Sequence, residues 1–315
     1  MRLPQTLPIM QFIRDIYAAG RGAGKPVVSF EFFTPKTEEG DRTLFGKTMP
    51  ALARLNPAYC SVTYGAGGST RDKTLSMVDR IQREYRIPAM AHLTCVGSTR
   101  EAIAGMLVQA KDRGVVNILA LRGDPPAGTS GFQQMEGGFR FAHELVTLTR
   151  KLGGFSIGVA GFPEGHIECK EGKEVDWRRL QAKIGCGADF VITQIFFDNA
   201  FFYEFRDYLV RKLGVTVPII PGIIAIQSAA QIQRFTALCG AAIPAALRAR
   251  LDTLVDDDAA AAEFGIEFAA QQCEDLLRAG VPGLHFYTLN KSASTARVLA
   301  SLGLDGPVSN GHVKP

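Results

Sequence analysis

Glu31 is the residue that first suggests chemistry. It lies in the strand-like run VVSFEFF, between Phe30 and Phe32, with no cation nearby in the sequence. An ionised carboxylate among apolar side chains is costly unless it is paired or protonated. Burial among Val and Phe should raise the pKa of Glu31, and a carboxyl group that keeps its proton near neutral pH can act as a general acid.

Other polar residues follow apolar runs in the same way. The segment LRGD follows ILA directly and is followed by two prolines, which predicts a rigid functional loop carrying Arg122 and Asp124. The glycine-rich GAGGST lacks the spacing of known phosphate-binding loops and is weak evidence for one. We interpret His285 and His143 as ordinary structural histidines. Polar or turn-forming residues at the remaining run ends are Thr63, Tyr64, His92, Thr94, Ala160 to Phe162, His166, Gln194, Tyr287, Asn290 and Lys291.

The elements that must position these residues alternate along the chain. Eight short, continuously apolar runs begin at Pro26, Ala58, Ile87, Val116, Phe155, Ala188, Val217 and Gly283. Such runs are typical of strands buried on both faces. Segments of helical period separate them, and several end near a glycine, which favours helix termination. These glycines are Gly114, Gly153, Gly185, Gly214 and Gly280.

Repeated strand and helix units predict a parallel sheet, and eight of them predict an α/β fold with a closed (β/α)8 TIM-type barrel. We interpret residues 1–24 as an N-terminal extension with a helix, 25–305 as a single-domain catalytic barrel with extra helices, and 306–315 as a loose C-terminal tail. The acidic run at Asp256 to Asp258 is typical of a helix start rather than a metal site. The aromatic segment from Phe196 to Leu209 should contribute mainly core. The helix after the seventh strand should end at Phe235, whose ring could overhang the barrel mouth.

Composition narrows the functional class. The chain has 315 residues, 35 basic and 31 acidic, and a net charge of +4. This small excess of positive charge gives no reason to expect nucleic acid or membrane binding. The N-terminus lacks a signal-peptide core, no segment has the roughly 20 apolar residues of a membrane span, and the six cysteines are scattered. We therefore expect a cytoplasmic protein with reduced thiols and no bound metal.

Taken together and in order, the motifs VSFEFFTPK, SVTYGAGGSTRDKT, HLTC, LALRGDPP, FPEGH, ITQIFFD, IIPGI and HFYTLN resemble those of the 5,10-methylenetetrahydrofolate reductases. The resemblance covers about residues 25 to 305. It implies non-covalently bound FAD and ping-pong hydride transfer. NADH or NADPH would reduce the flavin and leave. 5,10-Methylenetetrahydrofolate would then bind in the same place and become 5-methyltetrahydrofolate, which supplies methyl groups for methionine synthesis.

The resemblance also implies roles for individual residues. Glu31 would be the general acid that opens the imidazolidine ring, and Asp124 would orient folate and tune the flavin. The substrate side would comprise Gln194, Phe235, Tyr287 and Lys291. The FAD side would comprise Thr63, Tyr64, His92, Arg122, Gly123, Asp124, Ala160, Phe162, His166, Asp176 and Lys183.

Two positions depart from the family pattern. The family often has Tyr at the position of Phe162 and Arg at the position of Lys291. Lysine cannot reproduce a planar bidentate contact, so the second departure concerns how NAD(P)H or folate is held. The given sequence contains no counterpart of the family's regulatory domain, so adenosylmethionine inhibition is not expected. The family further implies a homo-oligomer.

Two alternatives stay open. One is a lyase or aldolase barrel without flavin, but no lysine lies at a predicted strand end before Lys291. The other is a non-catalytic ligand-binding barrel, which would not need a buried Glu31. The choice between NADH and NADPH is not readable, because the chain has no dinucleotide-fold acidic residue.

Overall fold

Eight parallel strands form a closed barrel in the computed structural model, which describes residues 11–23, 25–64, 71–124 and 132–305. Each strand pairs with its neighbours in chain order, and the eighth pairs with the first. The (β/α)8 prediction and all eight strand positions are confirmed. The strands are β1 (Val27–Phe32), β2 (Tyr59–Val62), β3 (Ala89–Thr94), β4 (Asn117–Leu121), β5 (Ser156–Gly161), β6 (Phe190–Ile195), β7 (Ile219–Ile223) and β8 (Gly283–Tyr287).

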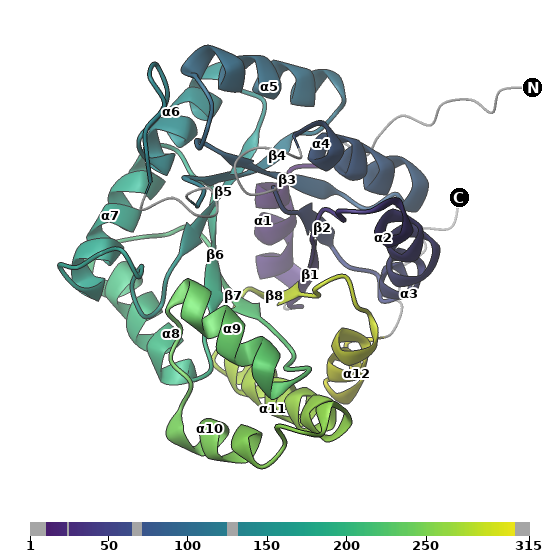
Figure 1. The fold of residues 1–315 in the computed structure, drawn as a ribbon. Helices are drawn as coiled ribbons and strands as arrows, with labels where there is room; N and C mark the ends of the chain where they lie inside the picture. The colour runs from purple at the N-terminus through teal and green to yellow at the C-terminus, as the bar shows by residue number, and fades with distance from the viewer. Residues whose placement is uncertain (1–10, 24, 65–70, 125–131, 306–315) are drawn as a thin grey trace, which may run out of the picture.

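Helices surround the barrel, which Figure 1 shows along its axis. They are α1 (Ile13–Ala23), α2 (Glu38–Thr43), α3 (Met49–Ala53), α4 (Arg71–Arg80), α5 (Arg100–Asp112), α6 (Ala142–Leu152), α7 (Lys173–Gly185), α8 (Asn199–Asp207), α9 (Ala229–Cys239), α10 (Ala245–Asp252), α11 (Asp258–Arg278) and α12 (Ala293–Ser301). Short π-helical turns extend three of the segments: η1 (Leu44–Thr48), η3 (Ile81–Tyr85) and η4 (Tyr208–Lys212). Helix α9 lies in front of β7 and β8, at the mouth of the barrel nearest the viewer.

Strand β1 shows how the sequence places Glu31 inside the barrel. Side chains alternate between the two faces of a strand. Phe30 and Phe32 pack in the large apolar cluster between strands and outer helices, whereas Val27 belongs to the cluster inside the barrel. Glu31 shares the inner face with Val27 and Ser29. The phenylalanines beside Glu31 in sequence therefore do not surround its carboxyl group.

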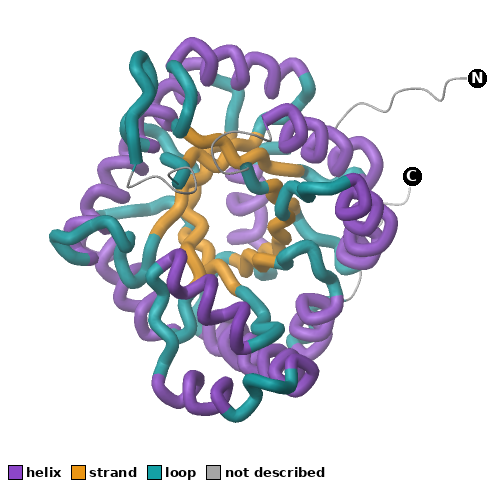
Figure 2. Tube along the Cα trace, viewed as in Figure 1, coloured by secondary structure: helices purple, strands orange, loops and turns teal. Residues whose placement is uncertain are grey.

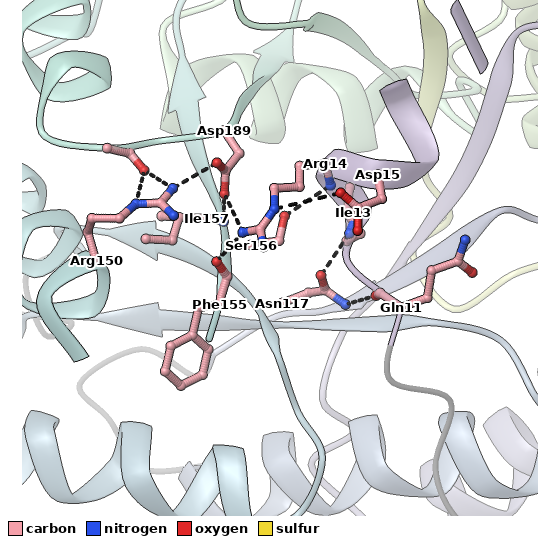
Figure 3. A network of polar contacts seen from close by, with 11 residues as sticks. Gln11, Ile13, Arg14, Asp15, Asn117, Arg150, Phe155, Ser156, Ile157 and Asp189 are labelled. Carbon is pink, nitrogen blue, oxygen red and sulfur yellow. Dashed lines mark hydrogen bonds and ion pairs between the residues drawn. The ribbon is translucent and has the colours of Figure 1, made fainter. Parts of the chain in front are cut away.

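Helix α1 covers the opposite end of the barrel from the mouth, and Figure 2 shows it through the ring of strands. Its backbone and side chains bond to the first residues of the strands (Figure 3). The backbone N–H of Ile13 donates to Asn117 Oδ1 at 2.9 Å, and the Arg14 guanidinium donates to the Phe155 carbonyl at 2.6 Å. Asp189 accepts from the Ile157 N–H at 2.8 Å and from Arg150 at 2.7 Å.

Several local predictions can be compared with the structure. Gly114, Gly153, Gly214 and Gly280 have φ between 68° and 74°, as helix-ending glycines do. The fifth assignment is wrong in detail, because α7 ends on Gly185 itself and the left-handed residue is Gly187, with φ of 116°. Helix α9 does not end at Phe235 but continues to Cys239.

Other predictions concern helix starts and the core. Asp257 caps α11 by accepting from the Ala260 N–H at 2.9 Å, as the helix-start interpretation predicts. Phe196, Phe202 and Phe205 are buried in the core, as predicted. The GAGGST loop, Pro125 and Pro126, and the 306–315 tail lie outside the described residues.

The described ranges contain neither a membrane-spanning helix nor a cluster of metal ligands. None of the helices there is both long and apolar enough to cross a membrane. Within the same ranges, no three His, Cys, Asp or Glu side chains are grouped so that they could hold a metal ion.

Candidate functional site

A buried cluster of polar side chains surrounds Glu31 near the mouth of the barrel. Glu31 Oε2 lies 3.3 Å from His285 Nε2 and 3.3 Å from His92 Nε2. It also accepts a hydrogen bond from Ser61 Oγ at 3.3 Å. Glu31 is 4% exposed, and all three partners are buried. The closed barrel thus brings together residues from β1, β2, β3 and β8.

His285 connects Glu31 to a lower layer of the barrel. Its second ring nitrogen, Nδ1, lies 2.8 Å from Ser29 Oγ. Its interpretation as a structural histidine missed the contact with Glu31. A signal was present in the sequence, because Ser29 and Glu31 are two positions apart on one strand and must share a face.

The prediction that the pKa of Glu31 is raised is wrong. Burial alone would raise it, but the positive charge of His92 and the hydrogen bond with His285 outweigh burial and lower the pKa to about 2. The error has a physical cause. The apolar neighbours in sequence point to the outer helices, while the histidines come from strands far away in sequence. In this state Glu31 is a carboxylate.

A second group of charged residues lies beyond the ends of β4 and β5. Arg122 forms an ion pair with Glu168 and lies over the Phe132 ring at 5.1 Å. Burial, with Arg122 nearby, lowers the pKa of His166. The backbone N–H of His166 donates to Asp176 Oδ2 at 3.1 Å. The Phe162 ring lies edge-on to the His166 ring, with 4.6 Å between the ring centroids.

Lys183 completes this group from helix α7. Its ammonium donates to the Ala160 carbonyl at 2.9 Å. Burial lowers its pKa to about 8, against the opposing effect of Asp176. Asp176 itself has a raised pKa because it is buried. The structure therefore brings Arg122, His166, Asp176 and Lys183 to one side of the mouth.

The residues on this side fit a phosphate-bearing cofactor such as FAD. Arg122 already holds an anion, the Glu168 carboxylate, where a phosphate could bind. Thr94 Oγ1 is buried and has no hydrogen-bond partner among the described residues. Gly123 has φ of 88°, and a Cβ there would lie 2.8 Å from Val96 Cγ1, so the loop can turn tightly only with glycine.

The predicted substrate side lies on β6, α9 and β8. The Tyr287 hydroxyl donates to the Thr193 carbonyl at 2.8 Å, beside Gln194. Tyr287 and Phe235 pack against the same apolar cluster, so both line one region of the mouth. Lys291 is exposed beyond β8.

Three predicted residues make little contact with these groups. The Tyr64 hydroxyl points to Met106 Sδ on α5, at 3.6 Å. Thr63 uses its carbonyl to accept from the hydroxyls of Thr34, at 2.7 Å, and Thr74, at 3.0 Å. Asp124 is exposed on the loop after β4 and is close enough to His166 to influence its pKa.

Comparisons with known proteins agree on one family. The family model described as methylenetetrahydrofolate reductase matches residues 15–303. The chain is 37% identical to a 5,10-methylenetetrahydrofolate reductase of Escherichia coli, with 89% of this chain and 92% of that protein covered. It is 39% identical to methylenetetrahydrofolate reductase (NADH) 1 of Zea mays, with 94% of this chain and 51% of that protein covered. The chain thus spans about half the length of the plant relatives.

A solved structure shows a similar fold. It is a protein of Clostridium thermocellum described as binding two copies of 5-methyl-5,6,7,8-tetrahydrofolic acid. The TM-score is 0.59 at 14% sequence identity, with 91% of this chain and 96% of that chain covered. At this identity the likeness concerns the fold alone.

Proposed function

The chain belongs to the methylenetetrahydrofolate reductase family, and from this we propose that it reduces 5,10-methylenetetrahydrofolate to 5-methyltetrahydrofolate. NADH or NADPH would be the reductant and FAD the cofactor. The observation that carries the proposal is the buried Glu31 with His92 and His285 at the mouth of the barrel. Catalytic groups of (β/α)8 enzymes lie at this end of the strands.

Glu31 would supply the proton that the reaction needs. The methylene carbon of the substrate bridges two nitrogens, and protonation of one nitrogen lets the five-membered ring open to an iminium. The proton would come from the Glu31 and histidine cluster as a unit. A bound substrate would exclude water from the mouth. Desolvation disfavours a charged carboxylate, so the proton would move to Glu31, next to the substrate.

Residues of the other two groups would bind and orient the ligands. FAD, when bound, supplies the hydride chemistry. Arg122 and Lys183 would neutralise its phosphates, and His166 and Asp176 would position that end of the site. Gln194 would hydrogen-bond the pterin, while Phe235 would stack on whichever substrate is bound. An aromatic ring suits this alternation because stacking tolerates two different planar ligands.

Wider properties are part of the same proposal. We infer that Asp124 orients folate near the flavin, that Tyr287 and Lys291 line the substrate side, and that the chain acts in the cytoplasm, in methyl supply for methionine. Thr63, Tyr64, Gly123, Ala160 and Phe162 would complete the cofactor side. We further infer that barrels associate as a homo-oligomer.

The test is a pair of anaerobic half-reactions on the purified protein. It should be yellow, its visible absorbance should fall when NADH is added, and 5,10-methylenetetrahydrofolate should restore it. NADH comes first because the plant relatives carry it in their names, and NADPH follows under identical conditions. A colourless protein that neither binds FAD nor oxidises either nucleotide would contradict the proposal and favour the lyase or binding-barrel alternatives.

A further inference from the structure

A column of hydroxyl groups runs below the Glu31 cluster, inside the barrel. Strand pairing places Ser29 beside both Tyr59 and His285, so these three residues form one layer across β2, β1 and β8. Ser29 Oγ lies 2.8 Å from His285 Nδ1 and 3.4 Å from the Leu284 carbonyl, and it interacts with the hydroxyl of Tyr59 beside it. The Tyr59 hydroxyl in turn lies 3.0 Å from the hydroxyl of Tyr17, on helix α1. The column therefore joins the closed end of the barrel to Glu31.

The surroundings of Tyr17 set the direction of these hydrogen bonds. Tyr17 is 1% exposed and packs in the inner apolar cluster with Ile13, Val27 and Phe190. Its hydroxyl has Tyr59 and Ser29 as its hydrogen-bond partners among the described residues. A buried hydroxyl proton without an acceptor is costly, whereas an oxygen already in one hydrogen bond tolerates an unused lone pair. The Tyr17 proton must therefore point up the column.

The position of the Tyr17 proton bears on the positions of the protons of Tyr59, Ser29 and His285. If Tyr17 donates to Tyr59, then Tyr59 can donate to Ser29 and Ser29 to His285 Nδ1. Nδ1 then acts as an acceptor and carries no proton. The single ring proton of a neutral His285 lies on Nε2, which is 3.3 Å from Glu31 Oε2. A proton on Nδ1 would instead leave Nε2 without one, so two acceptors, Nε2 and the Glu31 carboxylate, would face each other at 3.3 Å. The Ser29 proton would then turn to the Leu284 carbonyl, a longer contact of 3.4 Å.

We propose that Tyr59, with Tyr17 behind it, is a positioning residue that orients the Ser29 hydroxyl and so holds His285 as the neutral tautomer with its proton directed at Glu31. The helix that closes the barrel would thereby control a proton at the catalytic mouth. His285 would be a fixed hydrogen-bond donor, which leaves His92 as the histidine that exchanges a proton with Glu31. The kinetic part of this inference rests on the proposed function, whereas the tautomer of His285 does not.

The test compares Tyr59→Phe with the unchanged protein. The substitution keeps the ring, which packs edge-on to Tyr17 and stacked with His285 at centroid distances of 6.1 and 6.2 Å. Protein labelled with ¹⁵N at histidine reports through its ring-nitrogen resonances which nitrogen carries the proton, and a His285→Asn variant assigns the signals. We expect an unprotonated Nδ1 in the original protein. In Tyr59→Phe we expect about a fivefold shift of the population toward Nδ1–H, the equivalent of one buried hydrogen bond.

Tyr85→Phe is the matched control, because Tyr85 donates a comparable hydrogen bond to the Phe45 carbonyl at 2.9 Å outside the barrel. It should leave the His285 resonances unchanged. A protonated Nδ1 in the original protein, or identical spectra for Tyr59→Phe and the control, would overturn the proposal. If Tyr59→Phe does not fold, Tyr17→Phe removes the terminal donor instead and should shift the tautomer in the same direction by a smaller factor.

Kinetics provide the second readout. Tyr59→Phe should slow the folate half-reaction about fivefold, by the same hydrogen-bond energy, and leave reduction by NADH unchanged. Equal slowing of both half-reactions would contradict a role through Glu31. If the protein shows no folate reaction at all, the proposed function fails, and the tautomer measurement still decides whether Tyr59 positions His285.

Discussion

The buried polar groups at the two ends of the barrel differ in whether their hydrogen bonds are made within the protein. At the closed end, Asn117 accepts from the Ile13 N–H and donates to the carbonyls of Gln11 and Ala89, so its amide is fully bonded. At the mouth, Thr94 Oγ1 has no partner among the described residues, and His92 Nε2 approaches Glu31 without hydrogen-bonding geometry. Satisfied polar groups stabilise a fold, whereas unsatisfied ones are retained where a ligand can complete them. The closed end thus serves stability, whereas the mouth keeps polar groups that the proposed ligands could complete.

The largest effect should come from the carboxyl group at the mouth. Glu31→Gln removes the proton donor but keeps the shape of the side chain. The folate half-reaction should slow by roughly 100- to 10,000-fold, the usual contribution of general acid catalysis. Reduction by NADH should change little, whereas the urea midpoint of unfolding should fall, because the contacts with His92 and His285 that lower the pKa of Glu31 stabilise the folded protein at neutral pH. Stopped-flow absorbance of the two half-reactions checks this. Equal loss in both would show that Glu31 is structural or assists NADH instead.

A substitution at the closed end should lower the stability of the protein rather than its reaction rates. Asn117→Ala deletes three hydrogen bonds and leaves the buried Ile13 N–H unpaired. We expect unfolding free energy to fall by about 3 kcal/mol. Urea denaturation measures this loss, and the half-reactions of the folded fraction should stay within about fivefold of the original. A rate loss as large as that of Glu31→Gln would remove the distinction between the two ends.

A third substitution, at the mouth, should raise the stability of the protein, whereas Asn117→Ala lowers it. Thr94→Val replaces an unpartnered hydroxyl with a methyl group and should stabilise the cofactor-free protein by about 1 kcal/mol. Thr149→Val is the control, because the Thr149 hydroxyl is also buried but donates to the Leu145 carbonyl at 2.8 Å. That variant should lose about 1 kcal/mol. Thermal unfolding of both without FAD tests the contrast, which fails if both variants are destabilised alike.

The smallest effect concerns the ion pair beside the mouth. Glu168 pairs with Arg122 and would compete with an FAD phosphate for it, so Glu168→Gln should tighten FAD binding. Both side chains are partly exposed, which limits the gain to about fivefold or less. Quenching of FAD fluorescence measures the affinity. Glu171→Gln, which breaks the neighbouring pair with Arg179, is the control and should have no effect. Weaker binding by Glu168→Gln would mean that Glu168 helps to hold the cofactor.

The sequence alone determined the architecture of the barrel and the end of it at which the candidate site lies. Continuous apolar, β-branched runs can only be buried strands, and eight of them separated by helical segments close into a barrel. Polar residues at the strand ends then had to meet at one mouth, which placed Glu31 near His92 and Arg122 near His166. Asp176 and Lys183 lie on helix α7, and only the family resemblance pointed to them. These conclusions depend on patterns local in the chain, and such patterns can be read without coordinates.

Only the tertiary structure decided the state of Glu31. His285 is 254 residues away in sequence, yet barrel closure places β8 beside β1 and brings its imidazole to the carboxylate. The alternation of β1 turns Phe30 and Phe32 outward at the same time. Burial still raises the pKa of Glu31, but His92 and His285 lower it by more, whereas the neighbours of Glu31 in the chain predicted only the rise. The direction in which the pKa of a buried carboxyl group shifts depends on which side chains lie across the barrel. Those side chains meet Glu31 only after the first and last strands have paired.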